Sequence, residues 1–227
     1  MEHKDTAIYE DVHLSTPHIV EKRDSYHYTP KTFSDSFAKV TVRFLASCAD
    51  FLFKERYGER AIVLETVAAV PGMVGGLLQH LKSLRKIQDD RGWIKTLVDE
   101  AENERMHLLI YNQVAKPTSL ERFLIIFVQF FFYNFYFLIY LISPHIAHRI
   151  TGYLEEEAIN SYHHYLSLIE SGHIENIQAT ELAKTYWALA DDARLKDMVL
   201  ATIKDEMVHR DVNHQFSNDK IGTSLWG

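Results

Sequence analysis

Along most of the chain, hydrophobic positions recur with the spacing of an amphipathic helix. From about Ser34 onward, apolar residues return every three or four positions, and few residues interrupt the pattern. This periodicity predicts an all-α fold. Six long helices are expected near 34–56, 60–86, 92–116, 119–143, 146–170 and 192–215, and a shorter one near 179–190.

The interior prolines agree with most of these boundaries. Pro117 and Pro144 fall in expected connections, where a missing N–H costs little. Pro71 falls inside an expected helix and should bend it.

One stretch is apolar enough to cross a membrane. Residues 123–143, FLIIFVQFFFYNFYFLIYLIS, are long enough at about 1.5 Å per residue to span a hydrocarbon core of about 30 Å. The stretch also contains Gln129 and Asn134, and it lies between two segments that the site described below requires in one bundle. We therefore predict a helix that lies in the membrane plane or half-buried on the protein. The alternative is a wholly buried core helix.

The helix expected near 34–56 offers a second surface for a membrane. Phe37 and Phe44 belong to a set of apolar residues with near-helical spacing, and Lys39 and Arg43 are placed to meet anionic head groups.

Composition narrows the class of protein. The 227 residues are 47% hydrophobic, which indicates one domain with a sizeable core. The formal net charge is −7 and no long basic stripe is present, so no nucleic-acid partner is expected. The single cysteine, Cys48, stands outside any metal-ligand spacing, which excludes disulfide frameworks and thiolate clusters.

The two ends are expected to differ from the helical part. Residues 1–32 mix both charge signs without an apolar run, and we expect an extended arm. This arm is either a loosely packed tail or a segment laid on a partner subunit. The bundle is expected at 33–216, followed by a tail at 217–227.

A pair of Glu-x-x-His motifs carries the candidate chemistry. This spacing puts a carboxylate and an imidazole on adjacent turns of one helix face. Four such pairs occur, but Glu10/His13 lies in the polar arm and Glu170/His173 is interrupted by a glycine at a helix end. The remaining pairs, Glu104/His107 and Glu206/His209, each lie inside a long amphipathic helix.

Two other expected helices each supply a glutamate. Glu65 stands in apolar company, where a lone carboxylate needs a cation or a partner, and one of the residues 155–157 is the second candidate. Taken singly, Glu65 and the glutamate triple could each lie on a solvated surface. Two glutamates and two Glu-x-x-His motifs together form the ligand set of ferritin-like di-iron or di-manganese bundles. Carboxylate and imidazole suit iron and manganese.

Four segments resemble the alternative oxidase family: RYGERAIVLETVAAVPGMVGG, LVDEAENERMHLL, HRITGYLEEEAINSY and KDEMVHRDVNH. The resemblance covers roughly residues 40–215. It implies a four-helix di-iron bundle with two additional membrane-surface helices, two iron ions per chain and a homodimer. It also favours a helix at 123–143 that enters one leaflet over one that spans the membrane. By matched position, the implied iron ligands are Glu65, Glu104, His107, Glu155, Glu206 and His209.

The resemblance also implies roles around the metals. Tyr162 matches a redox-active tyrosine, and its position seven residues after Glu155 lets both share a helix face. His148, seven residues before Glu155, shares that face as well. Residues expected to orient the ligands or to line the site are Asn103, Asp205, Tyr186 and Trp187.

For a quinol, the resemblance implies a pocket near Asp50, Arg60, Leu64 and Ser161. The chain departs from the family pattern at Ala46, where many members carry an arginine, and Arg43 is the candidate replacement.

The resemblance therefore implies a ubiquinol oxidase that reduces dioxygen to water without pumping protons. A membrane-bound di-iron hydroxylase or desaturase is the alternative, and a non-catalytic ferritin-like metal-binding bundle is the second. Because the first thirty residues fit neither a signal nor a transit peptide, we expect the cytoplasmic face of a bacterial membrane. The matrix face of the mitochondrial inner membrane is the alternative location.

Overall fold

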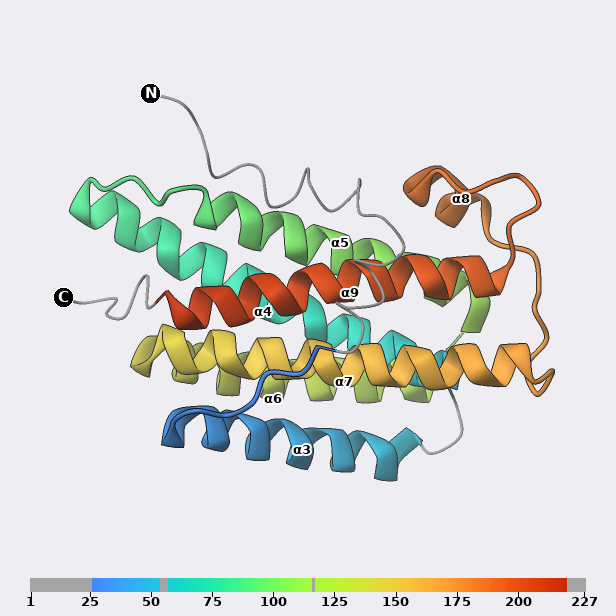
Figure 1. Cartoon of the computed structure of the whole chain (residues 1–227), viewed down its shortest axis with the longest axis horizontal. Helices are drawn as coiled ribbons and strands as arrows, with labels where there is room; N and C mark the ends of the chain where they lie inside the picture. Colours follow the sequence, from blue (N-terminus) through green and yellow to red (C-terminus); the bar gives the residue numbers. More distant parts are fainter. Residues whose placement is uncertain (1–25, 54–56, 116, 220–227) are drawn as a thin grey trace.

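The computed structural model describes residues 26–53, 57–115 and 117–219, and these form an all-α structure with seven helices (Figure 1). The prediction of six long helices and one short one is confirmed for these ranges. The helices are α3 (Phe33–Phe53), α4 (Tyr57–Lys86), α5 (Trp93–Ala115), α6 (Ser119–Ile142), α7 (Pro144–Glu170), α8 (Glu181–Trp187) and α9 (Leu195–Asn218).

Four of these helices, α4, α5, α7 and α9, form the central bundle. The most extensive contacts join α4 to α5 and α7 to α9, and α4 also packs on α7. A Cβ at Gly72 of α4 would collide with the main-chain oxygen of Leu97 in α5, so glycine is required where these two helices approach most closely. Figure 1 shows the long helices running roughly side by side, with α3 next to α7 at one side of the bundle.

Local signals explain where the helices begin. Ser143 caps α7, because its hydroxyl accepts from the N–H of Ile146 at 3.4 Å. Pro144 is the first residue of α7 and not part of the connection as expected, since a proline at this position loses no helical hydrogen bond. At the start of α9, Asp197 accepts from the main-chain N–H of Arg194 at 2.8 Å. Pro71 lies inside α4, which remains one helix across it.

α6 lies on the outside of the bundle, against α4 and α7. The stretch Arg122–Ile142 is long and apolar enough to cross a membrane by length and composition, and 17% of it is buried. α6 is therefore not the wholly buried core helix that was the alternative prediction for residues 123–143. The outward side chains of α6 include Phe123, Ile126, Phe127, Phe130, Phe131, Leu138 and Ile142.

α3 also presents an apolar face. Phe33, Phe37, Val40 and Phe44 are all exposed large hydrophobic residues. Its opposite face packs on α7, where Ala38 and Val42 are buried beside Ile150.

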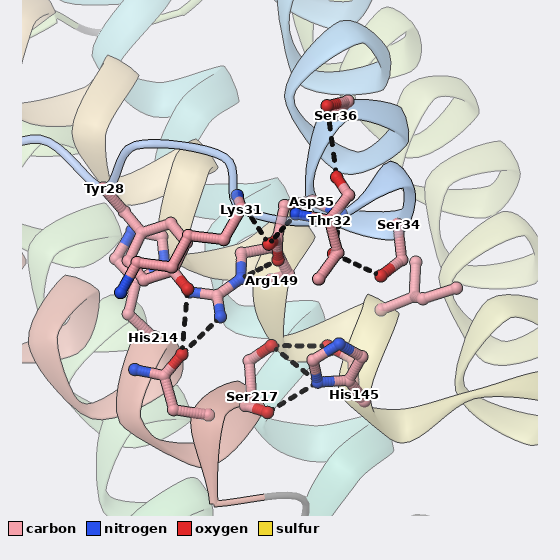
Figure 2. Close-up of polar contacts among 12 residues, drawn as sticks. Tyr28, Lys31, Thr32, Ser34, Asp35, Ser36, His145, Arg149, His214 and Ser217 are labelled. Carbon is pink, nitrogen blue, oxygen red and sulfur yellow. Dashed lines mark hydrogen bonds and ion pairs between the residues drawn. The ribbon is translucent and has the colours of Figure 1, made fainter.

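A buried arginine attaches the segment before α3 to the bundle. The guanidinium of Arg149, on α7, donates to Asp35 Oδ1 at 2.8 Å and lies 3.5 Å from the centre of the Tyr28 ring. It also contacts His214 Nδ1 at 2.9 Å, so that α3, α7 and α9 meet at one side chain (Figure 2). The described end of the arm thus packs on its own chain. Whether earlier residues contact a partner lies outside the described residues.

Candidate metal centre

Six side chains from the four bundle helices form two groups with metal-binding geometry. Each group offers ligand atoms that lie within 4.8 Å of one another. The first group contains Glu65, Glu104, His107 and Glu206. The second contains Glu104, Glu155, Glu206 and His209.

Glu104 and Glu206 belong to both groups, because each carboxylate lies between the two imidazoles. Glu104 Oε1 is 2.7 Å from His209 Nδ1, and Glu104 Oε2 is 3.6 Å from His107 Nδ1. Glu206 Oε1 is 3.2 Å from His107 Nδ1, and Glu206 Oε2 is 3.5 Å from His209 Nδ1. Glu104 and Glu206 could therefore contribute ligand atoms to both metal positions.

The six side chains fit a pair of cations. All six are at most 2% exposed. Among the described residues, both oxygens of Glu104 and Oε2 of Glu65 and of Glu206 receive no hydrogen bond of good geometry. Since carboxylates buried close together repel one another, the arrangement requires positive charge at its centre, from cations or from protons on the two imidazoles.

The electrostatics of the site agree with this view. Burial, together with repulsion from Glu104, raises the pKa of Glu65 well above its ordinary value. Burial and repulsion from Glu206 do the same for the pKa of Glu155. Burial lowers the pKa of His107, but attraction to Glu65 and the bond to Asp205 outweigh it, and the pKa of His107 is raised well above its ordinary value. Without metal, protons must supply the charge that cations would bring.

A polar cluster fixes the orientation of His107. Asp205 Oδ2 lies 3.0 Å from His107 Nε2 and accepts from Trp187 Nε1 at 2.8 Å and from Asn103 Nδ2 at 3.1 Å. Asn103 Nδ2 also lies 2.6 Å from the hydroxyl of Tyr186. Because Asp205 holds Nε2, Nδ1 of His107 faces the carboxylates. Asn103, Asp205, Tyr186 and Trp187 therefore lie together beside the site.

Tyr162 lies within the site. Its hydroxyl donates a hydrogen bond to Glu65 Oε1, and its ring stacks on Tyr111 with centroids 5.5 Å apart. Burial and repulsion from Glu65 raise the pKa of Tyr162 well above its ordinary value. The phenol therefore keeps its proton.

His148 differs from the other residues expected around the metals, because it lies in a separate buried network. It bonds Tyr140 of α6 through Nε2 at 3.0 Å and Asn213 of α9 through Nδ1 at 2.9 Å. The sequence reasoning missed Asn213 and Glu100, although each lies four residues, about one helical turn, from a ligand. Glu100 is 1% exposed, and burial raises its pKa to about 7.

The expected quinol residues are only partly described. The side chains of Asp50, Arg60 and Leu64 lie outside the described residues. Ser161 is half-buried on α7 and Arg43 is exposed on α3. The quinol pocket therefore stays a prediction.

Comparisons with known proteins agree with the geometry. A family model described as alternative oxidase matches residues 15–218. A Mangifera indica protein named ubiquinol oxidase, mitochondrial, is 55% identical over 193 residues, which are 85% of this chain and 60% of the relative. A Glycine max protein named alternative oxidase 3, mitochondrial, is 55% identical over 193 residues, or 85% of this chain and 59% of the relative. The chain thus spans about 60% of the length of these curated relatives.

Proposed function

Since the chain belongs to the alternative oxidase family, we propose that it is a quinol:dioxygen oxidoreductase with a di-iron centre. It oxidises two molecules of ubiquinol to ubiquinone and reduces one dioxygen to two waters. The observation that carries this proposal is the pair of carboxylate and histidine groups that share Glu104 and Glu206. The names of the curated relatives support ubiquinol as the substrate.

Iron fits the donor set, which contains four carboxylates and two imidazoles and no thiolate. Glu65, Glu104, His107, Glu155, Glu206 and His209 would hold two ions. When bound, the iron pair supplies the redox chemistry that passes four electrons from two quinols to one dioxygen.

The protein side chains prepare the site for this reaction. Glu104 and Glu206 would each contribute to both metal groups, and Asp205 keeps the His107 imidazole turned toward these carboxylates. Tyr162 would supply an electron or a hydrogen atom to the reaction, because its protonated hydroxyl donates a hydrogen bond to Glu65. Quinol oxidation releases four protons and water formation consumes four, so the reaction is balanced, and we propose that it proceeds without proton pumping.

The protein binds one face of a membrane without crossing it. The outward aromatic and aliphatic side chains of α6 and the apolar face of α3 support this placement, since a soluble protein rarely exposes so large an apolar surface. The bacterial cytoplasmic membrane is our expectation, and the mitochondrial inner membrane, matrix face, is the alternative that the relatives' names favour.

We also propose a homodimer, with its interface on an apolar stripe of α4 that is separate from the membrane-facing surfaces of α3 and α6. Met73, Leu77, Leu81 and Leu84 are exposed along one face of α4, three or four residues apart. A second copy of this chain would cover the stripe. We expect Leu81→Arg to give a monomer in detergent by sedimentation analysis, and an unchanged dimer would place the contact elsewhere.

Products and stoichiometry test the reaction. Purified protein supplied with ubiquinol should consume one dioxygen for every two quinols and form water, without a hydroxylated or desaturated organic product. An oxygen atom found in an organic product would favour the hydroxylase alternative. Iron uptake without any turnover would favour the storage bundle.

A further inference from the structure

A continuous line of hydrogen bonds joins α4, α6, α7, α9 and α5 beside the metal centre. Gln79 Nε2 donates to the Tyr140 hydroxyl at 3.1 Å, and that hydroxyl lies 3.0 Å from His148 Nε2. His148 Nδ1 lies 2.9 Å from Asn213 Oδ1. Asn213 Nδ2 is 2.9 Å from each oxygen of Glu100. All five side chains are at most 8% exposed.

The chemistry of the partners fixes the direction of this line. Asn213 Nδ2 faces the Glu100 oxygens and also the main-chain oxygen of His209 at 3.0 Å, and a main-chain oxygen can only accept. The amide oxygen of Asn213 must therefore accept from His148, which carries its proton on Nδ1. His148 Nε2 is then the acceptor for the Tyr140 hydroxyl. Every donor points toward Glu100.

The His148 ring has little freedom to leave this arrangement. Trp93 and Phe216 each contact it edge-on, with centroids 5.6 Å and 5.3 Å away, and Tyr140 contacts it at 5.3 Å. A ring held on three sides by aromatic neighbours, with both nitrogens bonded, keeps Asn213 in one orientation.

The two histidines of the site are held by different contacts. His107 is held through Nε2 by Asp205 on the neighbouring helix. For His209, the comparable carboxylate is the buried Glu100 of α5, which is linked to it through Asn213. Asn213 contacts both Glu100 and the helical turn that carries His209.

We propose that Glu100 and Asn213 are positioning residues for His209, as Asp205 is for His107, and that His148 and Tyr140 hold Asn213 in the orientation this requires. When it is ionised, Glu100 supplies the negative charge that orients the imidazole and strengthens it as a ligand. Through His148, the line also connects Asn213 to Tyr140 of α6. This inference rests on the proposed metal centre.

Cobalt(II) is a suitable probe, because its visible absorption reports the ligands around the ion. Titration of metal-free wild-type protein with Co(II) should produce a visible absorption band. The growth of this band with Co(II) concentration gives the affinity. Glu100→Gln keeps an acceptor for Asn213 but removes the charge. We expect its Co(II) affinity to fall about 10- to 100-fold with an altered spectrum, while the thermal unfolding midpoint of the metal-free protein changes little.

A charge-swapped double variant separates positioning from simple hydrogen bonding. In Glu100→Gln/Asn213→Asp, the amide and the carboxylate exchange places, so the bond from His148 and the bond between residues 100 and 213 can still form, whereas the bond to the main-chain oxygen of His209 is lost. We expect a modest loss of thermal stability, and Co(II) affinity should remain low. Recovery of wild-type affinity in the double variant, or an unchanged Co(II) spectrum in Glu100→Gln, would overturn the inference.

Two further variants complete the design. Tyr140→Phe removes a hydroxyl at the far end of the line, and we expect a smaller loss of affinity than in Glu100→Gln. Glu206→Ala removes a proposed ligand and should abolish Co(II) binding. A wild-type protein that binds no Co(II) would contradict the metal centre itself, and a Glu100→Gln variant equal to a binding wild type would contradict only the positioning role.

Discussion

The phenolic hydroxyl of Tyr162 donates a hydrogen bond to Glu65, the carboxylate that reaches the metal centre from α4. A residue of α7 is thereby joined directly to a proposed ligand on another helix. Because the hydroxyl is buried and stays protonated, it can deliver an electron and a proton without help from solvent.

Tyr162→Phe removes this hydroxyl and keeps the packing of the ring. Metal content and folding should survive, and ubiquinol turnover should fall at least about 100-fold, since each factor of ten requires only about 1.4 kcal/mol of barrier. Steady-state quinol oxidation and metal analysis on one preparation measure both quantities.

Tyr111→Phe is the matched control, because Tyr111 stacks on Tyr162 but bonds Thr202 instead of a ligand. It should lose about 1 kcal/mol of stability and keep near-normal turnover. A metal-replete Tyr162→Phe protein with wild-type turnover would refute the catalytic role.

Asp205→Ala should weaken metal binding about 10- to 100-fold, since His107 loses the carboxylate that orients it. Equilibrium titration with Co(II) measures this loss. Trp187→Phe removes one donor to Asp205 and leaves the contact between Asp205 and His107 in place, so it should lose much less affinity. Equal losses in the two variants would show that Asp205 does not act through His107.

His148 should make stability depend on pH. Burial lowers the pKa of His148 from 6.5 to about 4, so between these values the unfolded chain binds a proton that the folded chain does not. The stability that the neutral His148 imidazole contributes is therefore complete above pH 6.5. It is lost as pH falls toward 4, by up to about 1.4 kcal/mol per pH unit.

His148→Gln, whose side chain does not titrate, serves as the comparison. The difference in unfolding free energy between wild type and His148→Gln, measured by denaturant titration of metal-free protein, should shrink from pH 6.5 toward pH 4. A difference that stays constant over this range would show that the buried imidazole is protonated in the folded state.

The ion pair between Arg149 and Asp35 should contribute strongly to stability. Asp35→Asn leaves the buried guanidinium without its counter-ion, and we expect the unfolding free energy to fall by about 3–5 kcal/mol. Ser36→Ala, at the neighbouring exposed position, should change it by less than about 0.5 kcal/mol. Denaturant unfolding of both variants provides the measurement, and similar small effects would mean that Arg149 is satisfied by its other partners.

Membrane attachment should resist salt and yield to detergent, because burial of apolar side chains is not screened by ions. Phe127→Ser/Phe130→Ser, on the exposed face of α6, should shift protein into the soluble fraction, and Gln215→Ser on α9 should not. Fractionation of membranes after salt and detergent washes tests this. Cleavage by a protease added to the opposite side of sealed vesicles would instead indicate a spanning helix.

The helices and the ligand motifs could be predicted because their signals are local. Apolar periodicity located all seven helices to within about three residues, and Glu-x-x-His acts within a single helical turn. The contacts of Glu104 with His209 and of Glu206 with His107 join different helices, and only the structure shows them.

Contacts between helices were harder to predict. Glu155, Glu156 and Glu157 are consecutive, and spacing alone could not select among them. The structure places Glu155 in one of the two groups that could hold a metal ion, whereas Glu156 bonds His214 and the main chain of Tyr28. The partners of Glu156 come from distant parts of the chain, and no local pattern reveals them.

The same limit explains why Glu100 and Asn213 were missed. Each lies one turn from a ligand, which is a usable signal, but such residues are also common on solvated faces. Glu100 on α5 and Asn213 on α9 are 113 residues apart in the sequence. Only the packed helices show that these two residues are in contact.

The central claim is that six buried side chains hold two iron ions that carry out quinol oxidation. Iron content and ubiquinol-dependent dioxygen uptake, measured together for wild type, Glu104→Ala and Glu206→Ala, test it most directly. We expect about two iron ions per chain and activity in wild type, with both lost in each variant. An iron-free Glu104→Ala or Glu206→Ala protein that oxidises ubiquinol at the wild-type rate would contradict it.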